Sequence, residues 1–562
     1  MLTFSRDPQV AEHQVQAIIF YLTTFGYIDG HFDESEKQFV REYIGKLVET
    51  RVDDGMPDAT PEVRGELVAK FTTHFLEVFE GIDTHVKDLF TEAVSSDESQ
   101  ESFVHAKLKL RCYEIFQGFD KESQSALLDT VDEFIYADGE AHPAEMKLRA
   151  EVAALLEEDT GIELVAHSRP SIELMPPTEV EVEAGKETHP FFEQFEFHYS
   201  LEPEKINQQI TADLELLDRV VATLDERRAK GNGKLTGKQS VDDFAGQDGF
   251  LDGHTFVLPV KPGRKYELIV LGDIHGCYSN LKAAIMQSRF FEKVEAFKKD
   301  PENNPDPKLV LLGDYIDRGR FSLNGVLRAV MQVYVTAPDH VYVLRGNHEY
   351  YLEYKGQVYG GVKPAEAINS LKPHLPVEVF RKYMEAFDAL PNVLLFDKVM
   401  FVHGGIPRDL LVKEKWKDMS ALNDPDMRFQ MMWSDPSTAD IIPAELQEQS
   451  ARFPFGRLQA AAFLQRMGCH TLIRGHEKVE EGFKKNYDDD DVTLMTLFSA
   501  GGETNDDLTE DSSYRSVTPH ALTVTYENGE MEVTPWPLDY ERYNDPRYNR
   551  FFADEPEIEH RG

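Results

Sequence analysis

The chain has 562 residues, enough for two to four domains. It carries 101 Asp and Glu residues against 59 Lys and Arg residues, and the formal net charge of −42 argues against nucleic acid or an anionic membrane as a main partner. The three cysteines form no CxxC pair, and no apolar run is long enough for a transmembrane helix. Because the N-terminus also lacks the basic and apolar parts of a signal peptide, we expect a cytoplasmic protein with no membrane partner.

Residues 1–158 are predicted to form a helical domain. Apolar side chains recur at three- and four-residue spacing over residues 10–25 and 37–48, which is typical of amphipathic helices. An Asp-Gly turn separates the two stretches, and either Asp33 or Ser35 can cap the second helix.

A short acidic phrase occurs twice in this domain. Three positions recur with equal spacing in its two copies: Asp29/Asp138, Gly30/Gly139 and Glu36/Glu145. The phrase resembles the acidic helix corners of TerB-like helical domains, and this resemblance implies an interaction surface or a weak metal-binding corner. A capped helix–turn–helix with no such role is the alternative. The loop lacks the alternating acidic ligands of an EF-hand, so a calcium sensor is not expected.

The middle of the chain is predicted to connect two domains. Residues 159–202 gather Pro and Glu and lose helical periodicity, which indicates an extended linker. Residues 206–228 form a strongly amphipathic helix that stops at a Gly-Asn-Gly stretch. With an irregular connector over residues 240–265, this helix makes up a segment of residues 203–264.

Within residues 265–536, five predicted strands each end at a short polar motif. The strands are residues 266–271, 309–312, 340–344, 399–402 and 471–473. They run into the motifs GDIHG, GDYIDRG, RGNHE, HGG and RGH. These motifs contain six side chains of the metal-ligand type: Asp273, His275, Asp314, Asn347, His403 and His476. Since an α/β sheet exposes its ligands at the carboxyl ends of its strands, we expect the six side chains to meet at one edge.

The chemistry of this set favours two divalent metal ions. Carboxylate, imidazole and amide ligands without thiolate suit Mn, Fe or Zn, whereas the histidines disfavour a pure Mg or Ca site. Six ligands exceed the need of one tetrahedral ion, but two ions about 3.5–4 Å apart that share a carboxylate would use them all. Asp314 is central in chain order and is the predicted bridge.

The end of the chain is predicted to be a hairpin followed by a tail. Residues 522–526 and 531–534 read as two strands joined by a turn at Asn528 and Gly529. Residues 537–562 are aromatic and charged, and the sequence leaves open whether they pack on the preceding domain or bind a partner.

The five motifs, in this order, resemble those of the calcineurin-like metallophosphoesterases, and most closely those of the phosphoprotein phosphatase family of serine/threonine phosphatases. The segments FDALP, WSDP and FSA, which begin at Phe387, Trp433 and Phe498, favour that branch. The resemblance covers residues 266–501. It implies an α/β fold in which two mixed sheets form a β-sandwich flanked by helices, beside the separate N-terminal all-α domain.

The resemblance also implies a role for each residue of the site. One metal would be held by Asp273, His275 and Asp314. The second metal would be held by Asp314, Asn347, His403 and His476. A hydroxide that bridges the two metals would attack phosphorus.

Proton transfer and phosphate binding are assigned in the same way. His348 would protonate the leaving alkoxide while Asp317 orients it, and an imidazolium is a good general acid for that step. Arg318 would bind phosphate through its planar guanidinium, assisted by Asn347. Arg452 is the candidate for a second phosphate-binding arginine, although its spacing from WSDP is compressed.

One departure from the family pattern leaves the substrate open. After FSA the family usually continues with Pro-Asn-Tyr, whereas residues 501–506 here are GGETND. The main prediction is a protein serine/threonine phosphatase that needs two divalent ions, of which Mn is the most suitable in vitro. The alternative is a hydrolase of dinucleoside polyphosphates or other small phosphoesters. An alternative of another class is a helical interaction module, with a protein partner of its own and a regulated phosphatase domain.

Overall fold

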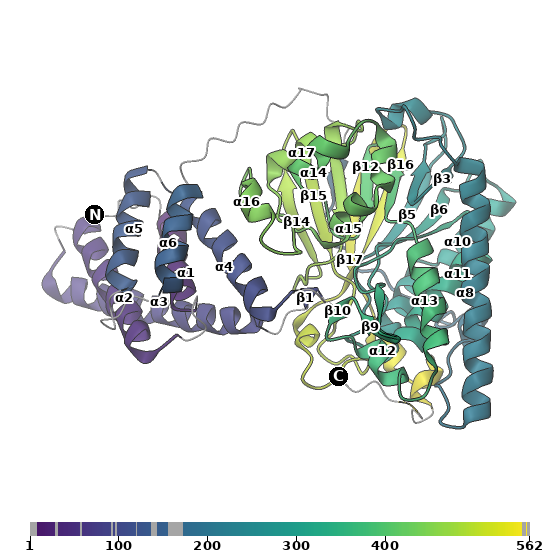
Figure 1. The fold of residues 1–562 in the computed structure, drawn as a ribbon, viewed down its shortest axis with the longest axis horizontal. Coiled ribbons are helices and arrows are strands. Elements are labelled where there is room, and N and C mark those ends of the chain that lie inside the picture. The colour runs from purple at the N-terminus through teal and green to yellow at the C-terminus, as the bar shows by residue number, and fades with distance from the viewer. Residues whose placement is uncertain are drawn as a thin grey trace. The chain divides into compact units, whose positions relative to one another are not determined.

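The computed structural model describes residues 8–27, 32–56, 59–90, 94–95, 98–117, 119, 121–135, 143–155, 172–553 and 558 (Figure 1). The chain divides into two units: Met1–Gly161 with Ser437–Ala451, and Ile162–Pro436 with Arg452–Gly562. The Asp-Gly pairs of the repeated acidic phrase, Asp29-Gly30 and Asp138-Gly139, lie outside the described residues.

The first unit is helical, as predicted. Its elements are α1 (Pro8–Gly26), α2 (Glu34–Gly55), α3 (Pro61–Leu89), the two-residue strand β1 (Val94–Ser95), α4 (Gln100–Gln117), α5 (Lys121–Ile135), α6 (Pro143–Leu155) and α16 (Ala444–Gln447). The core of this unit forms around α1, where Ile18, Leu22 and Phe25 are at most 1% exposed. Of the two predicted caps of α2, Asp33 is the one used: it accepts a hydrogen bond from the Glu36 backbone, and Glu36 returns one.

The second unit contains two mixed sheets. The seven-stranded sheet has the order β14 (Phe483–Asp488), β15 (Thr493–Leu497), β13 (Thr471–Arg474), β12 (Val399–Val402), β11 (Val393–Phe396), β4 (Thr255–Leu258) and β3 (Phe250–Asp252). The six-stranded sheet has the order β2 (Ile172–Leu174), β17 (Glu530–Pro537), β16 (His520–Glu527), β5 (Tyr266–Leu271), β6 (Asp306–Leu311) and β7 (Val341–Val343). Strands β8 (Tyr351–Tyr354) and β9 (Gln357–Gly360) form a separate hairpin, followed by β10 (Val362–Lys363).

The two sheets pack face to face, which confirms the predicted sandwich. Successive side chains of a strand point to opposite faces, and β11 shows the result. Leu394 and Phe396 lie in the hydrophobic cluster that also contains the six-stranded sheet. Val393 and Leu395 lie in a second cluster on the other face of β11, which is covered by helices.

Helices flank the sandwich. Those of the second unit are α7 (Pro190–Glu193), α8 (Pro203–Gly231), α9 (Tyr278–Gln287), α10 (Phe290–Lys299), α11 (Arg328–Thr336), α12 (Glu366–Leu371), α13 (Val377–Ala389), α14 (Asp409–Lys415), α15 (Pro425–Trp433) and α17 (Arg457–Gln465). Shorter helical turns span Val241–Phe244, Ser322–Leu327, Met419–Asn423, Ser513–Ser516, Glu541–Asn544 and Arg550–Phe552. Figure 1 shows α8 lying beside α11 and α13, the two helices against which it packs.

Two segments that sequence reasoning treated as irregular belong to the sheets. The predicted connector over residues 240–265 contains β3 and β4, a hairpin that extends the seven-stranded sheet through pairing of β4 with β11. The predicted linker over residues 159–202 contributes β2, which pairs with β17. Both corrections have one cause: strands of three or four residues carry too little alternation to be recognised by their own pattern.

The C-terminal segment packs on the catalytic unit. The predicted hairpin is present as β16 and β17, and both turn residues, Asn528 and Gly529, have positive φ. Beyond it, Tyr543 and Phe551 are at most 2% exposed and lie in the main core. The carbonyl oxygen of Phe551 lies 2.9 Å from His198 Nε2. The described part of the tail around Tyr543 and Phe551 therefore belongs to the core of the second unit.

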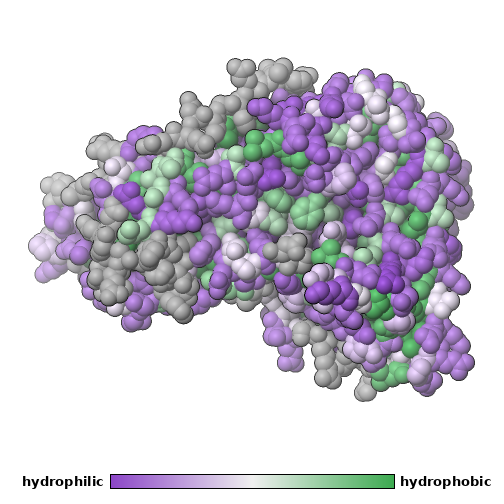
Figure 2. Space-filling model, in the orientation of Figure 1, coloured by the Kyte–Doolittle hydropathy of each residue, from purple (hydrophilic) through white to green (hydrophobic). Residues whose placement is uncertain are grey.

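The surface fits the acidic composition. On the face shown in Figure 2, hydrophilic residues cover most of the described surface, and hydrophobic residues appear in scattered patches. Within the described ranges, no helix combines the length and the apolar character needed to cross a lipid bilayer.

A buried ion pair fixes α8 to the sandwich. The Arg328 guanidinium on α11 bonds the Asp213 carboxylate on α8 at 2.7 and 3.0 Å, and their side chains are only 2% and 8% exposed. The Tyr199 hydroxyl donates to the same carboxylate at 2.5 Å. Burial, with the nearby Asp213 charge, raises the pKa of Tyr199 well above its usual value, so the hydroxyl stays a donor.

We expect Asp213→Asn to lower the free energy of unfolding by about 3–5 kcal/mol, because Arg328 would keep a buried charge without its partner. Urea unfolding of the full chain measures this change. The matched control is Asp218→Asn on the same helix, whose carboxylate is 65% exposed and 3.7 Å from Lys382, and which should change stability by less than about 1 kcal/mol. Equal effects of the two variants would contradict the assignment.

Candidate metal centre

The predicted ligands follow strands whose carboxyl ends lie together. β5, β6 and β7 run parallel in the six-stranded sheet, as do β12 and β13 in the seven-stranded sheet. The loops after these strands carry six buried ligand-type side chains: Asp273, His275, Asp314, Asn347, His403 and His476. An isolated bridge between Asp273 and Phe498 joins the loops after β5 and β15, so the two sheets meet at this edge.

The first predicted ligand group is brought together by the loops after β5 and β6. His275 Nε2 lies 3.6 Å from Asp273 Oδ2 and 3.5 Å from Asp314 Oδ2. The other ring nitrogen of His275, Nδ1, is 2.9 Å from the Ile316 carbonyl oxygen, which fixes the ring with Nε2 directed at the carboxylates.

The second predicted group converges on the same carboxylate. His403 Nε2 lies 3.4 Å from Asp314 Oδ2 and 2.8 Å from Asn347 Oδ1. His476 Nδ1 lies 2.9 Å from that same Asn347 oxygen. His403 Nδ1 faces the Leu312 carbonyl oxygen at 3.1 Å, so its Nε2 is the nitrogen available to a metal.

Asp314 is common to both sides of the site. Among the described residues, two buried sets have ligand atoms within 4.8 Å of one another: His275–Asp314–His348 and Asp314–His403–His476. The first set contains His348, which the sequence assigned to proton transfer rather than to a metal. Its Nε2 is 3.8 Å from Asp314 Oδ2, but its Nδ1 is engaged by Asp317.

The donor set fits divalent cations. Asp273 Oδ2 is buried and accepts no hydrogen bond within the described part of the chain, a costly state for a carboxylate that lacks a cation. Glycines leave room for the carboxylates: a Cβ at Gly346 would lie 2.2 Å from Asp314 Oδ1, and one at Gly475 would lie 2.3 Å from Asp273 Oδ1.

The electrostatics of the site also favour positive charge. Burial opposes protonation of His275, yet the nearby carboxylates of Asp273 and Asp314 raise the pKa of His275 to about 9. Burial likewise opposes the charged form of Asp314, but the charges of His403 and His348 hold the pKa of Asp314 well below its usual value. The ionised carboxylate of Asp314 therefore favours a cation at this site.

Several site residues adopt a backbone conformation that non-glycine residues rarely use. The φ angles are positive at His275 (45°), Asp314 (53°), Asp317 (68°), Arg318 (66°) and His476 (75°). Such conformations are unfavourable for residues with a Cβ and gather at functional sites, where the surrounding structure enforces them.

Asp317 and His348 form a buried pair. Asp317 Oδ2 is 2.7 Å from His348 Nδ1, and Asp317 Oδ1 accepts a hydrogen bond from the Ala367 backbone at 2.8 Å. Burial opposes the charged carboxylate, but the bond to His348 and the charge of Arg318 lower the pKa of Asp317. The carboxylate therefore stays ionised, and the His348 ring is held with Nε2 toward Asp314.

The two candidate phosphate-binding arginines lie at the site. Arg318 Nη1 is 2.8 Å from Glu366 Oε1, a partner that sequence reasoning missed because it lies on α12, far along the chain. Arg452 Nη1 is 2.6 Å from His476 Nε2 and 3.7 Å from Asp435 Oδ2. The compressed spacing after WSDP thus still brings Arg452 beside a predicted metal ligand.

Tyr514 is a second residue that sequence reasoning missed. Its ring centre is 5.4 Å from that of His275 and 5.2 Å from that of Phe498. Burial raises the pKa of Tyr514 above its usual value, although the charge of Arg318 opposes the rise. Tyr514 follows the altered loop after FSA by several residues, so the family spacing gave no signal for it.

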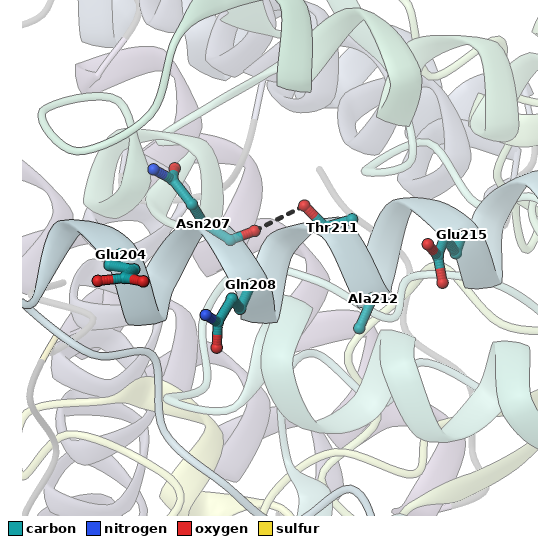
Figure 3. A pocket seen from close by; sticks show the side chains of 6 residues that line it. All are labelled: Glu204, Asn207, Gln208, Thr211, Ala212 and Glu215. Carbon is teal, nitrogen blue, oxygen red and sulfur yellow. Dashed lines mark hydrogen bonds between the residues drawn. The ribbon is translucent and has the colours of Figure 1, made fainter.

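One surface cavity is lined by other residues. A shallow cavity of about 440 Å³ runs along α8, where Glu204, Gln208 and Glu215 are among the residues that line it (Figure 3). Its lining contains acidic and amide side chains and Thr211, whose hydroxyl bonds the Asn207 carbonyl oxygen of the same helix. None of the predicted site residues lines this cavity.

Comparison with known proteins gives a family for part of the chain. Residues 266–480 match the calcineurin-like phosphoesterase family. A probable serine/threonine-protein phosphatase from Encephalitozoon cuniculi is 27% identical over 238 residues, which cover 42% of this chain and 47% of that relative. The chain thus spans about half the length of this curated relative.

Two solved structures are more distant. A protein serine/threonine phosphatase from Saccharomyces cerevisiae is 17% identical, with 49% of this chain and 80% of that chain covered and a TM-score of 0.32. A cold-active protein-tyrosine phosphatase from a psychrophilic Shewanella species is also 17% identical, with 50% and 82% covered and a TM-score of 0.29.

Residues 266–480 are therefore the part of the chain that is similar to calcineurin-like phosphoesterases. The family match confirms the resemblance inferred from the five strand-end motifs. The weaker resemblance of the N-terminal region to TerB-like domains stays a prediction.

Proposed function

We propose that this chain is a phosphomonoesterase that depends on two divalent metal ions, with Mn as the suitable ion in vitro, and that it removes phosphate from phosphoserine or phosphothreonine in proteins. The observation that carries this proposal is the convergence on Asp314: His275 and His403 approach its Oδ2 at 3.5 and 3.4 Å, and His348 stands at 3.8 Å.

The residues divide between two ion positions. Asp273, His275 and Asp314 would hold one ion, and the second would take Asp314, Asn347 Oδ1, His403 Nε2 and His476 Nδ1. When bound, such a pair of ions lowers the pKa of a water toward ~7 and withdraws charge from the phosphoryl oxygens. His476 Nε2 lies 2.6 Å from Arg452 Nη1 and 3.2 Å from the Trp433 carbonyl oxygen.

The other side chains bind the phosphate and move one proton. Arg318, with Asn347, holds phosphoryl oxygens, and Arg452 provides a second guanidinium from the opposite loop. His348 donates the Nε2 proton to the alkoxide oxygen of the leaving serine or threonine, since an alkoxide is too basic to depart unprotonated. Asp317 accepts the Nδ1–H bond, which orients the ring and stabilises its charged form.

Two alternatives remain for the biological role. The loop over residues 501–506 departs from the phosphoprotein phosphatase pattern, and its Asn505 turns inward to bond Asn280 at 2.8 Å. The residue of this region that lies beside His275 is Tyr514. This difference from the family pattern supports the alternative in which the substrate is a dinucleoside polyphosphate or another small phosphoester. The separate helical unit supports the other alternative, an interaction module with a protein partner and a regulated phosphatase domain.

The proposal predicts that metal-stripped full-length protein refilled with Mn hydrolyses a phosphothreonine peptide. Asp314→Asn should lower the initial rate by more than ~100-fold, since even outer-shell partners of a metal change activity by about 10- to 100-fold. The control is Asp490→Asn, an exposed acid, which should leave the rate unchanged. Diadenosine tetraphosphate is assayed in parallel, and turnover of the dinucleotide alone would replace the protein-phosphatase proposal with the small-phosphoester alternative.

The role of His348 predicts a dependence on the leaving group. His348→Ala should reduce kcat/KM for the phosphothreonine peptide by about 10²–10⁴-fold, because its alkoxide must be protonated. For p-nitrophenyl phosphate the loss should be less than about 10-fold, because nitrophenolate departs without a proton. Steady-state rates on both substrates measure the difference. Equal losses would show that His348 acts in another way, for example as a metal ligand.

A further inference from the structure

The hairpin of β8 and β9 is attached directly to one loop of the metal centre. It begins at Tyr351, three residues after His348, and ends at Gly360. At its base the Tyr350 backbone donates to the His348 carbonyl oxygen at 2.7 Å. The Gly361 backbone closes the base by donating to the Tyr350 carbonyl oxygen at 2.5 Å. The hairpin therefore starts and ends beside the residue proposed as the general acid.

One face of the hairpin packs on α13, and Figure 1 shows β9 beside this helix. Tyr351, Glu353 and Val358 share this face, because side chains alternate along each strand and Glu353 pairs with Val358. The Tyr351 ring lies 5.2 Å from that of Phe387 on α13. The Glu353 carboxylate is held by Arg381 of the same helix, at 2.7 and 2.8 Å. This face of the hairpin is therefore already occupied.

The opposite face is aromatic and exposed to solvent. The register pairs Leu352 with Tyr359 and Tyr354 with Gln357, so these four side chains point away from α13. Tyr354 is 62% exposed and Tyr359 is 46% exposed. The solvent face of an antiparallel pair is usually polar, and tyrosine is enriched where proteins bind other molecules.

A lysine stands over each of the two exposed rings. Lys355 Nζ lies 5.0 Å from the centre of the Tyr354 ring. Lys372 Nζ, at the end of α12, lies 4.8 Å from the centre of the Tyr359 ring. Among the described residues neither ammonium has a carboxylate partner, whereas Lys382 on α13 lies 2.9 Å from one. In a chain with a net charge of −42, this surface is locally cationic.

The turn of the hairpin carries its lysine at a cost in backbone energy. Lys355 and Gly356 both have positive φ, at 51° and 73°. The hairpin of β16 and β17 has the same kind of turn, with φ of 54° at Asn528 and 91° at Gly529. Asn-Gly is the favoured pair for such a turn, and a lysine with positive φ is unfavourable. The choice of Lys355 at this position indicates a use for its charge.

The exposed face lies within reach of a substrate bound at the metal centre. Six residues separate His348 from Tyr354, and an extended chain of six residues spans at most about 20 Å. A polypeptide with its phosphorylated residue at the site covers the same distance with a similar number of flanking residues. Residues that flank the phosphorylated position can therefore contact the hairpin.

We propose that the outer face of this hairpin binds acidic residues that flank the phosphorylated serine or threonine of a polypeptide substrate. The hairpin face is defined by Leu352, Tyr354, Lys355, Tyr359 and Lys372. The two ammonium groups attract the flanking carboxylates, and the two rings pack on their aliphatic parts. The inference rests on the proposed function and gives it a substrate class, phosphoproteins with acidic sequence around the modified residue.

The test compares two phosphothreonine peptides of equal length on the full-length, Mn-loaded chain. One peptide has glutamates on both sides of the phosphothreonine and the other has lysines. The wild type should show a kcat/KM about 10-fold higher for the glutamate peptide, mainly through KM, and added salt should reduce this preference. The net charge of the chain alone would give the opposite preference. p-Nitrophenyl phosphate, which is too small to reach the hairpin, measures the chemistry alone.

Three variants separate binding at the hairpin face from loss of folding. Lys355→Glu combined with Lys372→Glu should reverse the peptide preference and leave the rate on p-nitrophenyl phosphate unchanged. Lys355→Asn suits the turn better than lysine, so a loss of about 3-fold on the glutamate peptide cannot come from a misfolded hairpin. The control is Lys484→Glu, an exposed lysine on β14, which should match the wild type.

Binding of the same two peptides without their phosphate, measured by fluorescence anisotropy, tests the hairpin face without hydrolysis. The wild type should bind the glutamate peptide more tightly, and the double charge reversal should abolish this difference. An equal affinity for both peptides would overturn the proposal, as would a preference that survives the charge reversal. If light scattering showed a dimer that the reversal converts to a monomer, the face would belong to a second copy of the chain. Binding with this preference but no hydrolysis of any phosphoester would contradict the proposed function alone.

Discussion

The geometry of the site depends on one buried carboxylate, that of Glu349. It is fully buried and accepts backbone hydrogen bonds from Asp314 and Tyr315, both at 2.8 Å, and from Gly346 at 3.0 Å. It therefore joins the loop after β6, which presents Asp314, to the loop after β7, which presents Asn347 and His348. Each of these donors would cost about 1–3 kcal/mol if left buried and unpaired, so the two loops hold their positions together. Burial and the Asp314 charge raise the pKa of Glu349 to about 7, because the two carboxylates lie close together at this edge of the sheets.

Other contacts also hold the loops that present the site residues to the rigid strands and helices of the domain. Ser499 Oγ accepts from the Gly272 backbone at 2.9 Å, and the Ser499 backbone donates to the Asp273 carbonyl oxygen, so FSA holds the first ligand loop. On the phosphate side, Glu366 holds Arg318 from α12. The proposed metal pair and two guanidinium groups would need such support, because their like charges repel one another.

Sequence reasoning found the parts of the site that local patterns encode. A hydrophobic strand that runs into a ligand-type residue beside a glycine is a local signal, and five of them predicted the ligands that the structure brings together. The sandwich was predicted through the family resemblance, whereas β2, β3 and β4 were missed because three or four residues do not establish a pattern. Glu349 stood inside a recognised motif without a role, since two of its three donors, Asp314 and Tyr315, lie on another loop. Glu366 and Tyr514 reach the site only through tertiary folding, and no local pattern marks them.

The central claim is that two ions share Asp314, and the number of bound ions tests it most directly. Metal-stripped full-length protein, refilled with Mn and freed of excess metal, is measured by calorimetry and elemental analysis alongside Asp314→Asn and Asp317→Asn. The account predicts two ions in the wild type, one or none in Asp314→Asn, and two in Asp317→Asn, since Asp317 holds His348 rather than a metal. A single ion in the wild type, or two ions retained in Asp314→Asn, would contradict the shared carboxylate.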